Sequence, residues 1–107
     1  MAGQKAGGLR RLKLSWTSEA TDDLDEIWDY SAVTWGEAQA DRYLKDIRAA
    51  ASRLADGQIS GTAENQVRPN LRRVVVRLHV IWFRVVGTEL RVVRVLHQSR
   101  DAGVQLL

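Results

Sequence analysis

The last third of the chain places the strongest constraint on the fold. Apolar and β-branched residues dominate from residue 71 to residue 96, and Gly87-Thr88 is the main break in this run. Such a run, preceded by the turn residues Pro69-Asn70, is typical of strands rather than helices. We therefore predict three antiparallel strands, of which the last two form a hairpin across the glycine turn. The strands are expected over residues 71–77, 79–86 and 90–96.

A short strand and an amphipathic helix are predicted before residue 35. Leu12, Leu14 and Trp16 alternate with polar residues, which indicates a strand with one buried face. Thr17 or Ser18 offers a helix N-cap, and acidic residues follow near the positive end of the helix dipole. The apolar stripe of this helix comprises Ala20, Leu24, Ile27, Trp28 and Ser31, and its polar face comprises Asp22, Asp25, Glu26 and Asp29.

Trp35-Gly36 interrupts the helical pattern, and a second helix is predicted from Glu37 to a C′ residue at Gly57. Because the break is short, the two helices should form an antiparallel hairpin. Residues 58–65 are predicted to form a loop. The order β-α-α-β-β-β implies an α+β fold, an antiparallel sheet with a helical hairpin on one face. The second apolar stripe comprises Ala40, Tyr43, Leu44, Ile47, Ala51 and Leu54.

Length and composition restrict the class of protein. A chain of 107 residues suits one domain, here residues 9–107, after a Gly-rich segment over 1–8 that we expect to be a disordered tail. There is no cysteine, and His79 and His97 are the only histidines. We therefore expect no disulfide, no metal and no cofactor. No apolar run reaches the roughly 20 residues that cross a membrane, and no signal peptide is recognised, so a cytoplasmic location is expected.

The charged residues are distributed unevenly along the chain. Residues 19–56 contain ten acidic and four basic residues, whereas residues 57–107 contain eight arginines and three acidic residues. This asymmetry favours an acidic protein partner or a polyanion. Internal ion pairs between the two halves are an equally simple explanation.

The arginines of the predicted strands are the candidate binding residues. Alternate strand residues face opposite sides, so Arg91 and Arg94 should point to different faces, and so should Trp82 and Phe83. One aromatic should be in the core and the other on the uncovered face, among arginines that suit an acidic peptide or a base. For either aromatic taken alone, packing in the core is the simpler expectation. A solvated, edge-protecting strand surface is the alternative. The candidate partner surface comprises Arg73, Arg77, Trp82, Arg84, Arg91 and Arg94.

The polar segment after the last strand contains His97, Gln98, Ser99, Arg100 and Asp101. A histidine close to serine and aspartate invites comparison with a catalytic triad, but closeness in sequence is not triad geometry. No second feature supports a nucleophile, and metal ligation by the two histidines has no third partner. We assign no catalytic residue and no metal ligand.

Taken together in chain order, the motifs of residues 10–101 resemble those of the ParE branch of the RelE/ParE toxins. The resemblance implies a bacterial type II toxin that arrests growth by inhibiting DNA gyrase and is not an enzyme. It also implies a ParD-like ribbon-helix-helix antitoxin, which forms a hetero-oligomer with the toxin and alone contacts operator DNA. Target recognition is then expected in the segment from His97 to Asp101. The motifs include Leu14-Ser15-Trp16-Thr17, Leu24-Asp25-Glu26-Ile27-Trp28-Asp29-Tyr30, Trp35-Gly36, Val67-Arg68-Pro69 and Val92-Val93-Arg94-Val95-Leu96-His97-Gln98.

Two alternatives remain from the residues alone. RelE-like toxins cleave ribosome-bound mRNA, and the resemblance places Val80 and Ser99 where that branch carries arginines, with no counterpart of its terminal tyrosine among residues 102–107. Arg73 and His97 keep this alternative open, since phosphoryl transfer needs cationic or acid–base side chains. The second alternative is a non-enzymatic nucleic-acid-binding module, which would bind nucleic acid with a strong salt dependence.

Overall fold

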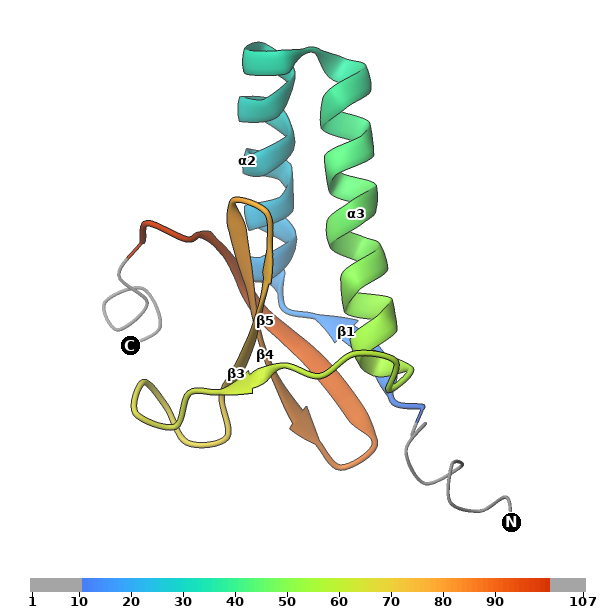
Figure 1. Cartoon of the computed structure of the whole chain (residues 1–107), viewed down its shortest axis with the longest axis vertical. Helices are drawn as coiled ribbons and strands as arrows, with labels where there is room; N and C mark the ends of the chain where they lie inside the picture. The colour runs from blue at the N-terminus through green and yellow to red at the C-terminus, as the bar shows by residue number, and fades with distance from the viewer. Residues whose placement is uncertain (1–10, 101–107) are drawn as a thin grey trace.

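Two helices and a five-stranded sheet make up the part of the chain that the computed structural model describes, residues 11–100 (Figure 1). Residues 1–8 and Asp101 lie outside this range. The helices form the expected antiparallel hairpin, and one end of it projects beyond the sheet. The elements are β1 (Lys13–Trp16), α2 (Ser18–Trp35), α3 (Glu37–Ala55), β2 (Thr62–Ala63), β3 (Arg72–Val76), β4 (His79–Val86) and β5 (Glu89–His97).

The sheet is mixed, not wholly antiparallel as expected. Its strand order is β1-β5-β4-β3-β2, and β1 runs parallel to β5 while the other pairs are antiparallel. The direction of β1 follows from the position of α2, because Thr17 links the two elements and donates its backbone N–H to Val92 of β5 (3.0 Å). The predicted loop over residues 58–65 also contains a two-residue strand, β2, which extends the sheet beyond β3.

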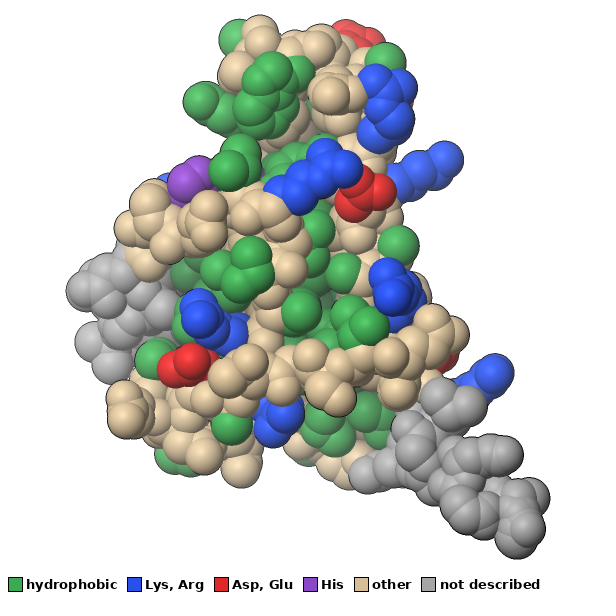
Figure 2. Space-filling model, in the orientation of Figure 1, with side chains coloured by type: hydrophobic (Ala, Val, Ile, Leu, Met, Phe, Trp, Pro, Cys, Tyr) green, Lys and Arg blue, Asp and Glu red, His purple; other side chains and the backbone are tan. Residues whose placement is uncertain are grey.

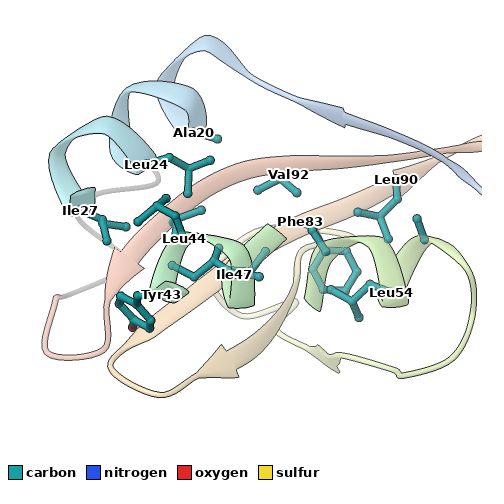
Figure 3. Close-up of a cluster of buried hydrophobic side chains, with 14 residues drawn as sticks. Ala20, Leu24, Ile27, Tyr43, Leu44, Ile47, Leu54, Phe83, Leu90 and Val92 are labelled. Atoms are coloured by element: carbon teal, nitrogen blue, oxygen red, sulfur yellow. The ribbon is translucent and has the colours of Figure 1, made fainter. Parts of the chain in front are cut away.

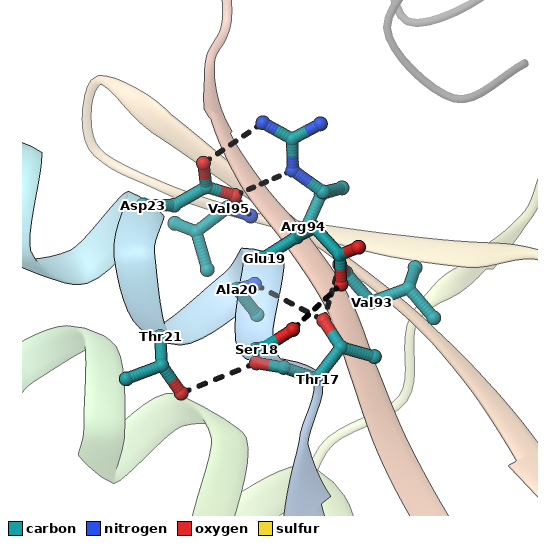
Figure 4. A network of polar contacts seen from close by, with 9 residues as sticks. All are labelled: Thr17, Ser18, Glu19, Ala20, Thr21, Asp23, Val93, Arg94 and Val95. Carbon is teal, nitrogen blue, oxygen red and sulfur yellow. Dashed lines mark hydrogen bonds and ion pairs between the residues drawn. The ribbon is translucent and has the colours of Figure 1, made fainter.

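The expected caps define both ends of the hairpin. Thr17 is the N-cap of α2, and its Oγ1 accepts from the N–H of Ala20 (3.0 Å) and donates to the carbonyl of Val93 (2.8 Å) (Figure 4). Gly57 has φ of +79° after α3, and Gln58 N–H donates back to Arg53 (2.9 Å). These bonds are those of a Schellman motif, which needs a residue that tolerates positive φ.

The larger core lies between the hairpin and the sheet (Figure 3). Both predicted stripes face it, with one difference. Trp28 is only half-buried, because its indole N–H donates to Asp41 Oδ1 of α3 (2.8 Å) near the surface. The stripe residues that are buried are Ala20, Leu24, Ile27, Ser31, Ala40, Tyr43, Leu44, Ile47, Ala51 and Leu54.

A second, smaller core lies on the sheet face turned away from the helices, called the far face below. Trp82 packs there with Leu71, Val80 and Leu96 and is only 5% exposed. Phe83 packs in the helix-facing core. Core packing of each aromatic, the simpler expectation, is confirmed, and the alternative that one of them is exposed is wrong. The segment before β3 folds onto the far face and covers Trp82 with Leu71 and Val67.

Replacing Leu44 with alanine should lower the free energy of unfolding by about 2–5 kcal/mol, because it removes a core side chain that is 4% exposed. Urea unfolding monitored by circular dichroism measures this change. Val33→Ala is the matched control, since Val33 is 90% exposed on α2 and should change stability by less than about 0.5 kcal/mol. Equal effects of the two substitutions would contradict the packing of α3.

Within residues 11–100, neither helix is both long enough and apolar enough to cross a membrane.

Candidate partner-binding surfaces

Asp23 joins α2 to the outer edge of β5. Its carboxylate accepts both Nε and Nη2 of Arg94 (2.7 and 2.8 Å) and also the backbone N–H of Val95 (2.9 Å) (Figure 4). β1 pairs with β5 only as far as Val92. Beyond Val92, α2 takes the place of a neighbouring strand and supplies the hydrogen-bond acceptor for this edge of β5. The hydrogen bond with Asp23 raises the pKa of Arg94, which stays charged. In this structure Arg94 stabilises the fold rather than forming part of an open basic face.

A β-bulge changes the orientation of the arginines in β5 from the one expected by simple alternation. Phe83 pairs with Val92, whereas Trp82 pairs with Arg94, so Val93 is an extra residue in the strand. The extra residue shifts the alternation of side chains by one position. Arg91 and Arg94 consequently start from the same face of the sheet, but the guanidinium of Arg94 turns to Asp23 of α2, whereas Arg91 pairs with Glu89.

The far face carries three of the six candidate arginines beside Trp82. The guanidinium of Arg73 lies over the Trp82 ring, 5.9 Å from its centroid, and pairs with Glu64 (3.3 Å). Arg84 and Arg91 are direct cross-strand partners, an arrangement in which like charges repel. The Nε of Arg84 is buried and has no hydrogen-bond partner within residues 11–100. This donor is left unsatisfied at a cost of about 1–3 kcal/mol.

An acidic side chain balances only part of this charge. Glu89 accepts from Ser15 and pairs with Arg91 (3.3 Å). The Ser15 hydrogen bond, together with Arg91, lowers the pKa of Glu89. Arg84 has no acidic partner among residues 11–100, so within this range the far face keeps a net positive charge around the Arg84–Arg91 pair.

Arg77 is separated from the other candidate arginines. It occupies the two-residue turn between β3 and β4 with φ of +53°, and its guanidinium pairs with Asp46 of α3 (2.8 Å). The same group lies 5.7 Å from the centroid of the Tyr43 ring. Positive φ is uncommon for a residue with a side chain. The contacts with α3 offset this strain and hold Arg77 on the helix side of the sheet.

The segment from His97 to Arg100 is exposed and borders the main cavity, of about 450 Å³, between α2 and the end of β5. Gln98 N–H donates to the Leu78 carbonyl (2.8 Å), and Arg100 N–H donates to the His97 carbonyl (2.9 Å). The backbone of this segment is therefore held against the β3–β4 turn. Residues on the wall of the cavity include Glu26, Tyr30, Trp35, His79, His97 and Arg100.

Exposed hydrophobic side chains form a patch where the hairpin projects past the sheet (Figure 2). Tyr30 is 67% exposed and contacts Trp35 edge to face, with ring centroids 6.3 Å apart. Leu78, on the β3–β4 turn, and Trp35 also border a smaller hollow of about 200 Å³. Large exposed hydrophobic residues that gather in one place indicate a contact surface for another molecule.

A buried phenol connects α3 to the first residue of β4. Tyr43 Oη lies 2.6 Å from His79 Nδ1, 3.1 Å from the Val76 carbonyl and 3.2 Å from the backbone N of Leu78. Burial raises the pKa of Tyr43. Burial and then the neighbouring His97 lower the pKa of His79 to about 4, against a smaller opposing effect of Asp23. At neutral pH the His79 ring is therefore uncharged.

The described residues contain no assembled catalytic triad around the polar segment. His97 Nδ1 contacts Ser99 Oγ (2.8 Å), but the backbone N–H of Ser99 also donates to Nδ1 (3.1 Å), as in a local turn. Across residues 11–100, no group of three or more His, Cys, Asp or Glu side chains is arranged to hold a metal ion. Val80, at the position that the RelE branch gives to arginine, is 3% exposed in the far-face core.

Sequence reasoning missed two structural residues, Asp23 and Tyr43. Asp23 lies three residues after Ala20 and four before Ile27, so it falls within the apolar stripe of α2. An acidic residue at such a position must find a partner when it is buried, and this signal was available. Tyr43 was expected in the core, but nothing in the sequence indicates that its hydroxyl meets His79.

Comparisons with known proteins agree with this architecture. Residues 14–102 match the family described as ParE toxin of type II toxin-antitoxin system, parDE. Toxin ParE1 of Caulobacter vibrioides is 37% identical over 92% of this chain and 99% of its own length. Toxin ParE1 of Mycobacterium tuberculosis is 39% identical over 78% of this chain and 86% of its own.

A solved structure gives the same result at the level of the fold. A chain from the chromosomal ParDE toxin–antitoxin system of P. aeruginosa superposes with a TM-score of 0.71 at 27% identity, covering 82% of this chain and 97% of that one. The expected RelE/ParE-like α+β fold is therefore confirmed, with the helical hairpin packed on the sheet. The agreement extends over nearly the whole length of the relatives, and the chain belongs to the family of ParE toxins of type II toxin–antitoxin systems.

Proposed function

We propose that this ParE-family toxin arrests bacterial growth by inhibiting DNA gyrase and is neutralised by a ParD-like antitoxin. The observation that carries the proposal is the family match over residues 14–102, which includes every helix and strand described above except the first residue of β1. Gyrase inhibition is the activity generally ascribed to this family, and the antitoxin is the second member of each parDE pair.

The environment of the candidate residues favours this function over mRNA cleavage. Stabilising a scissile phosphate requires cationic or proton-transferring side chains directed at one point. Val80 is apolar and buried, and Arg73 is already paired with Glu64. Arg73 is in β3 and His97 ends β5, and β4 lies between these two strands. We therefore propose that the toxin acts by binding and not as an enzyme.

We propose that the segment from His97 to Arg100 contacts the target, together with Asp101, which lies outside the described residues. The segment is exposed, its backbone is anchored to Leu78, and it borders the main cavity. An anchored, exposed segment can present polar side chains to a large partner with a small entropic cost.

A supercoiling assay with purified gyrase tests this function. The toxin should block supercoiling of relaxed plasmid and increase the yield of cleaved DNA, and the double variant His97→Ala/Arg100→Ala should lose most of that effect. Arg53→Ala is the matched control, since Arg53 is an exposed basic residue at the far end of α3. Circular dichroism should show the same folded state for all three proteins.

A ribosome-dependent mRNA cleavage assay, run in parallel, tests the RelE-like alternative. Cleavage of ribosome-bound mRNA with no effect on gyrase would show that the RelE-like alternative is correct. Strong, salt-sensitive binding of the isolated toxin to nucleic acid, without either activity, would instead support a nucleic-acid-binding module.

A further inference from the structure

The turn between β3 and β4 is not favoured by its own sequence. It consists of Arg77 and Leu78, which connect the paired residues Val76 and His79. Arg77 comes first in the turn and has φ of +53°. Hairpin turns of this length need positive φ at that position, where glycine or asparagine is usual. Because an arginine there is strained, contacts from outside the hairpin must stabilise the turn.

The hydroxyl of Tyr43 provides such contacts from α3. Its Oη accepts the backbone N–H of Leu78 (3.2 Å) and lies 3.1 Å from the Val76 carbonyl and 2.6 Å from His79 Nδ1. A phenol can donate one hydrogen bond and accept two, so Oη can accept from Leu78 whichever ring nitrogen of His79 carries the proton. These three partners lie on both sides of Arg77 in the chain. The hydroxyl therefore fixes the turn on both sides of its strained residue.

A second polar contact between the turn and α3 is exposed to water. Arg77 Nη2 lies 2.8 Å from Asp46 Oδ2, and the two side chains are 64% and 46% exposed. An ion pair so open to water contributes little to stability. Tyr43, in contrast, is 4% exposed and lies at one end of the core drawn in Figure 3. Its hydroxyl is therefore the stronger of the two polar anchors.

The backbone of Leu78 transmits this anchoring to the segment that follows β5. Its N–H is bound by Tyr43, and its carbonyl accepts the N–H of Gln98 (2.8 Å). A second route passes through His79, whose ring lies edge to face against the ring of His97, with centroids 5.3 Å apart. Both routes begin at the Tyr43 hydroxyl and end in the first two residues of the exposed segment that is proposed to contact the target.

We propose that Tyr43 is a positioning residue for target binding: its hydroxyl fixes the β3–β4 turn, and the turn holds the backbone of residues 97–100 in the orientation that meets gyrase. The link to gyrase rests on the proposed function. Tyr43 is buried in the core and acts on the target only through Leu78 and His79. Holding a binding segment in one conformation raises affinity by reducing the entropy lost on association. A phenylalanine would fill the same space in the core but would not hold the turn.

Amide hydrogen exchange of Tyr43→Phe, followed by NMR, tests the anchoring directly. The Gln98 amide should exchange about ten-fold faster than in the wild type, because the turn that carries its acceptor opens more often. Ile47→Val is the matched control, since Ile47 lies one turn further along α3 and is 0% exposed. This variant should lower the overall stability through the core and leave exchange at Gln98 unchanged.

A rescue variant separates the turn from other effects of the lost hydroxyl. Glycine adopts positive φ without strain, so Arg77→Gly should make the turn less dependent on α3. The double variant Tyr43→Phe/Arg77→Gly should therefore recover most of the slow exchange at Gln98. No recovery would show that the hydroxyl does not act through the turn, and would overturn this route.

The gyrase supercoiling assay measures the consequence for function. Tyr43→Phe should raise the toxin concentration for half-inhibition by roughly three-fold to ten-fold, whereas Ile47→Val should inhibit as the wild type does. Unchanged exchange at Gln98 in Tyr43→Phe would overturn the proposal, and so would unchanged inhibition or an equal loss in Ile47→Val. If the wild type leaves gyrase untouched, the proposed function fails, and the exchange rates alone then decide whether Tyr43 holds the segment.

Discussion

Asp23→Ala is expected to lower the free energy of unfolding by about 3 kcal/mol, the lower end of the range for removing one partner of a buried ion pair. The Asp23 side chain is 9% exposed and Arg94 24%, so water compensates Arg94 only in part. The substitution also leaves the Val95 N–H without an acceptor at the β5 edge. Urea unfolding measures the loss, and amide hydrogen exchange of Val95 should become faster.

The double variant Asp23→Ala/Arg94→Leu isolates the ion pair. It should be less destabilised than the sum of the two single variants, because the guanidinium that loses Asp23 is also removed. Glu26→Ala, which removes an exposed acidic residue one turn away, should change stability by less than about 0.5 kcal/mol. Additive effects of the two single variants would contradict the assigned role of Asp23.

Reversing the charge of Arg84 and Arg91 together should slow association with the antitoxin by about 10-fold to 10³-fold, if an acidic antitoxin segment binds the far face. Arg84 and Arg91 are direct cross-strand partners in β4 and β5, and the Arg84 Nε lacks a partner within residues 11–100. Both features indicate positive charge that a partner would compensate. Surface plasmon resonance at several salt concentrations measures the association rate and its salt dependence.

Two further variants distinguish binding from stability. Arg84→Glu alone should stabilise the free toxin, because it replaces a repulsive cross-strand pair with an attractive one, while still weakening capture of the antitoxin. Arg48→Glu/Arg53→Glu changes the net charge of the toxin equally, on the exposed face of α3, and should have a smaller effect. An unchanged association rate and unchanged salt dependence in the far-face double variant would rule out this surface as the antitoxin site.

Local sequence determined the elements and the larger core. The spacing of Leu24 and Ile27, and of Leu44, Ile47 and Leu54, follows the helical period, and these side chains are buried. Thr17 and Gly57 cap the helices as expected, because each cap depends on the chemistry of one residue and its immediate neighbours. The glycine turn before β5 and the order of the elements could also be predicted, because they too depend on local sequence.

Features that depend on residues far apart in the chain were decided by the tertiary structure alone. Trp82 is buried because a separate segment covers the far face, and Arg94 pairs with Asp23 because α2 lies beside the part of the β5 edge that β1 leaves open. The direction of β1 follows from where α2 packs, and the meeting of His79 with His97 follows from the register of two strands. Periodicity records which face of an element is apolar, but strand pairing and loop packing set what that face meets.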